Sequence, residues 1–304
     1  MTAVVGTVAV VTDSTGYLPP GLAAEHGIHV VSLQVSLGQR LGRDTIDVGP
    51  AEITTALADP ATPVGTSRPA PAEFAALYRE LLDGGASEVV SVHLSRRLSG
   101  TWEAARIAAD EVDPSVVRVV DSRSTGMGLG FAVLAAARAA AAGQPGAAVE
   151  AAAAEVAARS RVFFCVDSLE HLRRGGRIGA AAAWLGSALA VKPVLHVTDG
   201  LIEPLEKVRT AARAMTRLVE LAVRAAGPGA AELAVHHLGA AERAEELARR
   251  LGEELPAARP CLLSEVGAVL GAHAGPGLLG VVVVPPASER PGPGRGGLTG
   301  GHCA

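Results

Sequence analysis

The sequence predicts an α/β fold of two lobes, in which mainly parallel sheets are flanked by helices. Short apolar runs alternate with Ala- and Leu-rich segments of helical periodicity along nearly the whole chain. This alternation is typical of βαβ units, whose strands run parallel and whose crossover helices cover the sheet. The length of 304 residues fits about two domains of roughly 150 residues each.

We expect an N-terminal lobe over residues 1–160, a C-terminal lobe over residues 161–284 and a disordered tail over residues 285–304. The tail is rich in Pro and Gly, and such segments bury too little apolar surface to order themselves. The two lobes divide the alternating pattern about equally.

The N-terminal lobe begins with TVAVV at residues 7–11, an apolar run typical of a strand that is buried on both faces. Further strands are expected at residues 28–35, 88–94 and 116–120. Apolar residues at helical spacing predict helices at residues 19–26, 47–57, 72–82, 101–110, 127–142 and 147–158. Residues 62–71 (TPVGTSRPAP) have the Pro, Gly and Ser content of a loop.

The C-terminal lobe continues the same alternation. Apolar runs predict strands at residues 161–166, 191–197, 231–236, 262–266 and 280–284. Helical periodicity predicts helices at residues 169–172, 180–189, 210–224 and 241–251.

Charge and composition exclude several classes of partner. The chain has 27 Lys and Arg against 31 Asp and Glu, and only 3% of its residues are aromatic, which argues against a nucleic-acid-binding protein. The longest apolar helical segment, residues 178–191, is shorter than the ~20 residues that cross a bilayer. The N-terminal residues lack the basic region of a signal peptide. We therefore expect a cytoplasmic protein without stable membrane insertion. The three cysteines have no metal-ligand spacing, so neither a metal nor a cofactor is expected.

Hydroxyl-rich loops follow several of the predicted strands. Residues 13–15 (DST), 95–100 (SRRLSG) and 121–122 (DS) each come directly after an apolar run. In open α/β sheets, ligands bind outside the carboxyl ends of the strands, and these ends meet at one edge. The sequence therefore predicts an anion site at the sheet edge.

Two of the loops combine several hydroxyls with the start of a helix. Thr66 and Ser67 stand in a TSRP sequence, and Ser99 stands in an LSGT sequence that follows Ser95. Free N–H groups at a helix start favour an anion, and Ser or Thr there adds neutral donors. Ordinary helix capping is the alternative explanation for each motif alone.

Cationic residues cluster in three further segments. Arg177 follows a Gly-Gly turn, Arg209 ends a KVR sequence, and His273 precedes a Gly-Pro-Gly sequence. Guanidinium groups near glycines suit phosphate oxygens, and histidine can carry a proton near neutral pH. Surface charge and a structural histidine remain the alternatives.

Together these motifs resemble the DegV family, the fatty-acid-binding subunits of the bacterial fatty acid kinase system. The matching stretches occur in family order between about residues 8 and 284: VTDS at 11–14, TSRP at 66–69, LSGT at 98–101, VDS at 120–122, residues 172–178, KPVL at 192–195, KVR at 207–209 and residues 273–277. Where the family usually has a second serine, this chain has Arg96.

The resemblance implies that a long-chain fatty acid lies in a buried tunnel at the sheet edge and the interface of the lobes. It implies four residues that bind the carboxylate: Thr66, Ser67, Ser95 and Ser99. It also implies a surface that faces the phosphate and the kinase: Arg177, Arg209 and His273. The chain is then expected to be no enzyme itself. It would present the bound carboxylate to a separate ATP-dependent fatty acid kinase subunit for acyl-phosphate formation.

Two alternatives remain open from the residues alone. The first is a serine hydrolase that uses Ser14 or Ser99 with Asp13 or Asp121 and His273. The second is an anion- or nucleotide-binding α/β protein, in which the Gly-rich loops and Arg177 hold a phosphate.

Overall fold

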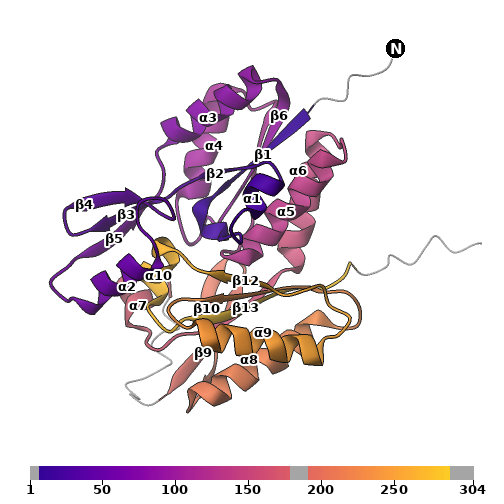
Figure 1. Cartoon of the computed structure of the whole chain (residues 1–304). Coiled ribbons are helices and arrows are strands. Elements are labelled where there is room, and N and C mark those ends of the chain that lie inside the picture. The colour runs from indigo at the N-terminus through magenta and orange to yellow at the C-terminus, as the bar shows by residue number, and fades with distance from the viewer. Residues whose placement is uncertain (1–6, 179–190, 288–304) are drawn as a thin grey trace, which may run out of the picture.

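The computed structural model of the chain describes residues 7–178 and 191–287. The expected helix at 180–189 and most of the expected tail lie outside these residues. Within them, the strands form a four-stranded, a six-stranded and a three-stranded sheet. The four-stranded sheet and its helices make up one half of the molecule, and the six-stranded sheet makes up the other (Figure 1).

The four-stranded sheet is entirely parallel and has the order β2-β1-β6-β7. Its strands are β1 (Thr7–Asp13), β2 (Ile28–Val31), β6 (Ala86–His93) and β7 (Val117–Asp121). The centre of β1 is an uninterrupted apolar run, and that of β6 is apolar except for the buried Ser91, because helices cover both faces. The α/β prediction, with a parallel sheet flanked by helices, is confirmed.

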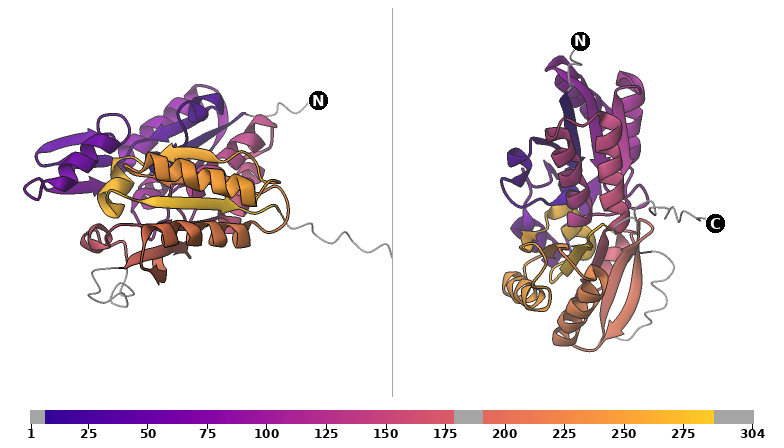
Figure 2. Two further views of the ribbon diagram at one scale, coloured as in Figure 1. Left: turned by 60° about the horizontal axis from the view of Figure 1, so that its bottom comes forward. Right: turned by 90° about the vertical axis from the view of Figure 1, so that its right-hand side faces the viewer.

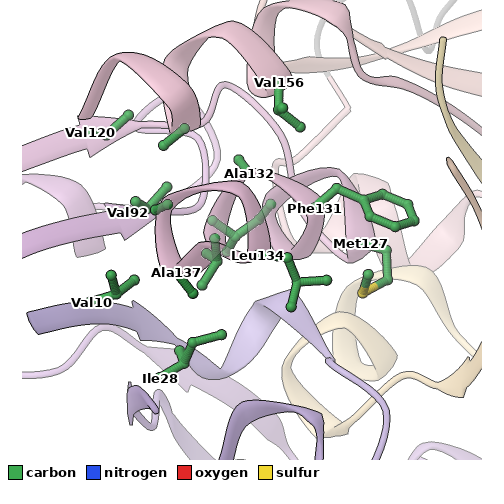
Figure 3. Close-up of a cluster of buried hydrophobic side chains, with 14 of the residues drawn as sticks. Val10, Ile28, Val92, Val120, Met127, Phe131, Ala132, Leu134, Ala137 and Val156 are labelled. Carbon is green, nitrogen blue, oxygen red and sulfur yellow. The ribbon is translucent and has the colours of Figure 1, made fainter. Parts of the chain in front are cut away.

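Alternate residues of these strands enter two separate clusters, as the pleat requires. Val11 and Val89 pack against α3 (Pro71–Asp83) and α4 (Thr101–Val112). On the opposite face, Val10 and Val92 pack against α5 (Met127–Ala141) (Figure 3). The helices α1 (Leu22–Glu25) and α6 (Gly146–Arg159) lie on this second face.

A small antiparallel sheet, which the sequence did not predict, projects from this half of the molecule. It has the order β4-β3-β5, formed by β3 (Gln34–Leu37), β4 (Arg40–Arg43) and β5 (Val64–Ser67). The strand expected at 28–35 is thus two strands in different sheets, and the loop expected at 62–71 contains β5. The helix α2 (Pro50–Ala58) connects β4 to β5 and begins with Pro50 at its first turn, a position that proline favours.

The six-stranded sheet has the order β10-β9-β8-β13-β11-β12. Its strands are β8 (Arg161–Cys165), β9 (Lys192–Thr198), β10 (Leu201–Val208), β11 (Glu232–His237), β12 (Leu262–Glu265) and β13 (Leu279–Val284). Only β11 and β12 pair in parallel, so the expectation of mainly parallel strands is wrong for this sheet. One reason is a hairpin: Asp199 and Gly200 both have positive φ, which joins β9 directly to β10.

Helices α8 (Ala211–Ala226) and α9 (Ala241–Glu254) lie side by side on one face of the six-stranded sheet (Figure 2). The short helices α7 (Glu170–Arg174) and α10 (Ala268–Ala274) contact each other, and α10 also contacts α2 and β5. Ala234, Val282 and Val284 of this sheet belong to the same apolar cluster as α5. Because the two halves share a core at α5, independent folding of residues 1–160 and 161–284 stays a prediction.

Candidate functional site

An elongated cavity lies where the two larger sheets and the small sheet meet. Most of its wall is apolar, with Leu33, Leu94, Phe164, Leu172, Val269 and Val282 among its residues. Its volume, measured as the space that the centre of a water molecule can occupy, is about 100 Å³. A single water needs only roughly 10–15 Å³ on that measure. The cavity therefore offers room to a larger, mainly apolar ligand.

One group of polar residues in the wall comes from four separate segments. Thr66 and Ser67 stand at the end of β5, with Arg68 directly after them. Ser99 lies in the turn before α4, Arg177 follows α7, and His273 is on α10. The fold thus brings together the TSRP, LSGT, Arg177 and His273 motifs, which are widely separated in the sequence.

The pairing of β5 with β3 and a close contact at Gly100 position the two hydroxyl loops. Thr66 is opposite Val35 in the small sheet, and this fixes its direction. The Arg68 guanidinium donates to the carbonyl of Gly100 at 3.2 Å. A Cβ on Gly100 would lie 2.6 Å from Nη1 of Arg68, so only glycine leaves room for this approach.

His273 connects α10 to the TSRP loop. Its Nε2 lies 2.9 Å from Oγ1 of Thr66, whereas its buried Nδ1 has no partner in the described part of the chain. Burial, and secondarily the charge of Arg177, lowers the pKa of His273 to about 4. The imidazole is therefore neutral at pH 7.

Arg177 links the turn after α7 to the loop before α4. Its Nε donates to the carbonyl of Leu98 at 3.1 Å, and its Nη1 donates to the carbonyl of Gly175. Ser99 lies beside this contact. Its Oγ is 2.9 Å from Oγ1 of Thr101 and accepts the Thr101 N–H at 3.3 Å, so it also caps α4.

Two of the expected site residues do not line the cavity. Ser95 is fully buried, and its Oγ donates to the carbonyl of Gly200 at 2.7 Å, which fastens the loop after β6 to the β9–β10 hairpin. Arg209 is exposed, between β10 and α8. The roles expected for Ser95 and Arg209 stay predictions, because the sequence could not give the direction of their side chains.

Another part of the wall contains Thr125, Gly126 and His236, which sequence reasoning did not single out. Nε2 of His236 accepts the N–H of Met127 at 2.7 Å, and its Nδ1 lies 3.2 Å from the carbonyl of Ser264. Burial lowers the pKa of His236 to about 4. This neutral ring caps α5 from the opposite sheet. An isolated threonine and an isolated histidine carry no spacing signal that would have identified them.

The residues of the proposed hydrolase do not assemble. Ser14 donates to Asp44, His273 contacts Thr66, and Asp121 accepts the N–H groups of Arg96 and Arg123.

A triad-like chain does exist elsewhere in the four-stranded sheet. Nδ1 of His93 lies 3.0 Å from Asp13, and its Nε2 lies 2.7 Å from Oγ of Ser91, which accepts from Tyr78. The side chains of Asp13 and His93 have no exposed surface, and Ser91 is fully buried. No substrate can reach this serine, so the chain of hydrogen bonds serves the core.

The described residues contain no helix that is long and apolar enough to span a membrane. They also contain no group of three or more His, Cys, Asp or Glu residues arranged to hold a metal ion. The polar atoms of the cavity are therefore hydroxyl, guanidinium and imidazole groups.

Comparison with known proteins places this geometry in a family. The model described as "Uncharacterised protein, DegV family" matches residues 7–286. The chain belongs to the DegV family. A DegV domain-containing protein of Streptomyces coelicolor is 51% identical over 276 residues, which cover 91% of this chain and 98% of that protein.

Solved DegV structures share the whole fold. The structure entitled "Fatty Acid Binding of a DegV family Protein from Thermus thermophilus" has a TM-score of 0.87 and 34% identity, covering 92% of this chain and 100% of that chain. DegV of Bacillus subtilis, described as a fatty acid binding protein, has a TM-score of 0.83 and 34% identity, covering 91% and 99%. These DegV proteins are thus described as fatty acid binders.

Proposed function

We propose that this protein binds a long-chain fatty acid in the cavity and presents the carboxylate to a separate ATP-dependent fatty acid kinase subunit. One observation carries the binding proposal: an apolar cavity whose wall includes three hydroxyls, a guanidinium and a neutral imidazole, from Thr66, Ser67, Ser99, Arg177 and His273. A mostly apolar wall suits an acyl chain and does not suit the several charges of a nucleotide.

The apolar wall would supply most of the affinity. A palmitate-length chain has about 14 methylenes, and each buried methylene contributes ~0.8 kcal/mol, so complete burial is worth roughly 11 kcal/mol before the costs of association. Hydrogen bonds to the carboxylate add roughly 1.5–3 kcal/mol each and fix the direction of the ligand.

The hydroxyls would bind the carboxylate directly. Thr66, Ser67 and Ser99 are available as donors at the cavity wall. Ser95 would act indirectly, because its hydrogen bond to the carbonyl of Gly200 holds the loop that carries Ser99. Neutral donors leave more charge on the carboxylate than a bidentate arginine does, which favours its attack on a phosphoryl group.

The kinase step would use the groups of the cavity wall that surround the carboxylate. Neutral His273 and cationic Arg177 lie beside Thr66 and Ser99 and would meet the phosphoryl group. Arg209, on the exposed surface, would contact the kinase subunit. The partner then performs the ATP chemistry in the cytoplasm, and this chain needs no cofactor and no catalytic residue of its own.

The first test is chemical. We expect an organic extract of the purified, unsupplemented protein to contain about one equivalent of a long-chain fatty acid by mass spectrometry. An empty extract, together with no thermal stabilisation by added C14–C18 acids, would refute fatty acid binding.

Variants test the site. Ser99→Ala should lower fatty acid affinity about tenfold, because one hydrogen bond to a charged group is lost. Ser87→Ala is the matched control: it removes an exposed hydroxyl at the opposite end of β6, where Ser87 donates to Thr7. Equal affinities for the two variants would remove Ser99 from the carboxylate site.

The kinase proposal has a separate readout. Arg209→Glu should reduce acyl-phosphate formation by the reconstituted kinase while fatty acid affinity stays at the wild-type value. A normal rate of acyl-phosphate formation in this variant would refute the contact.

A further inference from the structure

Thr125 places an unpaired hydroxyl in the cavity wall, apart from the cluster of Thr66, Ser99 and His273. The residue follows β7 and directly precedes α5. It is only 7% exposed, and its Oγ1 has no hydrogen-bond partner among the residues that the structure describes. A buried hydroxyl without a partner is rare in folded proteins and costs stability.

The polar groups around Thr125 already have partners. The N–H of Gly126 donates to the carbonyl of Thr15, and the carbonyl of Ser124 accepts from Ser95. Both nitrogens of His236 are engaged, with Met127 and with Ser264. Rotation of the Thr125 side chain toward these groups would therefore compete with existing bonds. The unpaired hydroxyl of Thr125 is therefore available to a ligand in the cavity.

Thr125 comes from a different segment than the residues of the proposed carboxylate site: it follows β7, whereas Thr66 lies at the end of β5 and Ser99 precedes α4. The N–H of Ser99 donates to Ser95, and the N–H of Ser95 donates to Ser124, so two hydrogen-bonded steps separate Ser99 from the residue before Thr125. The neighbouring wall is apolar. Val162 and Val282, which pair across β8 and β13, both line the cavity.

We propose that Oγ1 of Thr125 is a subsite for an oxygen atom on the aliphatic chain of the ligand, so that the cavity prefers a hydroxylated fatty acid to the unsubstituted acid of equal length. This inference rests on the proposed fatty acid binding. A threonine hydroxyl both donates and accepts, so it satisfies a ligand hydroxyl in either direction. Along the apolar part of the wall, a ligand hydroxyl loses its hydration without a replacement. The preference is therefore specific for one position along the chain.

The experiment uses the full-length protein after removal of bound lipid. Calorimetry measures the affinity for stearate and for a series of hydroxystearates that differ only in the position of the hydroxyl. We expect one isomer to bind about tenfold more tightly than stearate and the others to bind more weakly than stearate. Thr125→Val should abolish the preference for that isomer, and Thr125→Ser should retain it.

The outcomes separate the two proposals. If neither stearate nor any isomer binds the wild-type protein, fatty acid binding itself is refuted. If stearate binds but no isomer is preferred, or if Thr125→Val keeps the preference, only the subsite is refuted. Thermal denaturation of the lipid-free variants gives an independent check: Thr125→Val should melt at or above the wild-type temperature because it removes an unpaired hydroxyl. A lower melting temperature that Thr125→Ser restores would mean that the hydroxyl has a protein partner, and would overturn the subsite.

Discussion

Asp44 joins the N-terminal loops to the helix that carries His273. The carboxylate is fully buried between β4 and α2. One oxygen accepts from Ser14 at 2.8 Å and from the Tyr17 hydroxyl at 2.9 Å. The other accepts the N–H groups of Ala268 and Val269, in the first turn of α10, at 2.8 and 3.3 Å.

Replacing Asp44 with Ala leaves two O–H groups and two N–H groups without their acceptor in the core, although the oxygens of Ser14 and Tyr17 still accept the N–H groups of Leu33 and Leu270. Each hydrogen bond to a charged group is worth roughly 1.5–3 kcal/mol, but four bonds to one residue do not add. Burial raises the pKa of Asp44 and its hydrogen bonds lower it, so the carboxylate itself is costly to bury and its removal returns part of the loss. We expect Asp44→Ala to lower the free energy of unfolding by about 3 kcal/mol.

Asp44→Asn should cost about half as much. The amide oxygen can still accept the two N–H groups of α10, while its NH₂ replaces the oxygen that Ser14 and Tyr17 face. The site should respond as well, because Val269, Leu270 and His273 of α10 line the cavity. Fatty acid affinity is therefore expected to fall in Asp44→Ala by more than in Asp44→Asn.

Urea denaturation of lipid-free protein measures the stability, and calorimetry measures the affinity. Asp83→Ala is the control, since Asp83 is an exposed residue at the end of α3 and its loss should change stability by less than about 0.5 kcal/mol. If Asp44→Ala stays within about 1 kcal/mol of the wild type, Asp44 does not fasten α10 and the reasoning is refuted.

Three further predictions follow from other contacts. Burial lowers the pKa values of His236 and His273 to about 4, so both residues bind protons more tightly in the unfolded chain than in the folded protein. The free energy of unfolding should be at its full value above pH 6.5 and should fall by roughly 3 kcal/mol for His236 as the pH approaches 4. A urea midpoint that does not change with pH over this range contradicts the prediction. Gly126→Ala should cost about 2 kcal/mol or more in thermal denaturation, because φ is +57° and the new Cβ would lie 2.9 Å from Nε2 of His236. Gly252→Ala is the control and should stabilise, because Gly252 lies in the last turn of α9 and a Cβ there would have no atom within 4 Å. Thr66→Val removes the partner of His273 and should weaken fatty acid binding about tenfold in calorimetry; unchanged affinity would exclude Thr66 from the site.

The parallel sheet was predictable because its strands are rich in valine and have helical segments between them. The antiparallel hairpin was not. Glu203, Pro204 and Glu206 interrupt the apolar pattern of β10, and such a sequence is tolerated because β10 is an edge strand whose outer side needs no partner. The missing strand explains only the β9–β10 pair. The other antiparallel pairs, β8–β9, β8–β13 and β11–β13, join strands that were predicted, and the apolar runs do not give their directions.

The cavity was predictable only through its motifs. Thr66, Ser67, Ser99, Arg177 and His273 all contribute to its wall, although their roles stay predictions. Ser95 precedes Ser99 by only four residues, yet its side chain faces the β9–β10 hairpin, because the chain turns between the two serines. Thr125 became visible only once its hydrogen bonds were accounted for.

The cavity wall runs from Leu33 to Val282, so nearly the full length of the chain must be in place before a ligand can bind. Ligand binding therefore reports complete folding, because a fragment of the chain would lack part of the cavity wall. The proposed ligand would also stabilise the fold: a ligand present at a hundredfold excess over its dissociation constant adds about 2.7 kcal/mol to the free energy of unfolding. In a cell rich in that fatty acid, more of this protein would be folded and protected from proteolysis. In a cell short of the fatty acid, more of the protein would be degraded, so its abundance would follow the supply of its ligand.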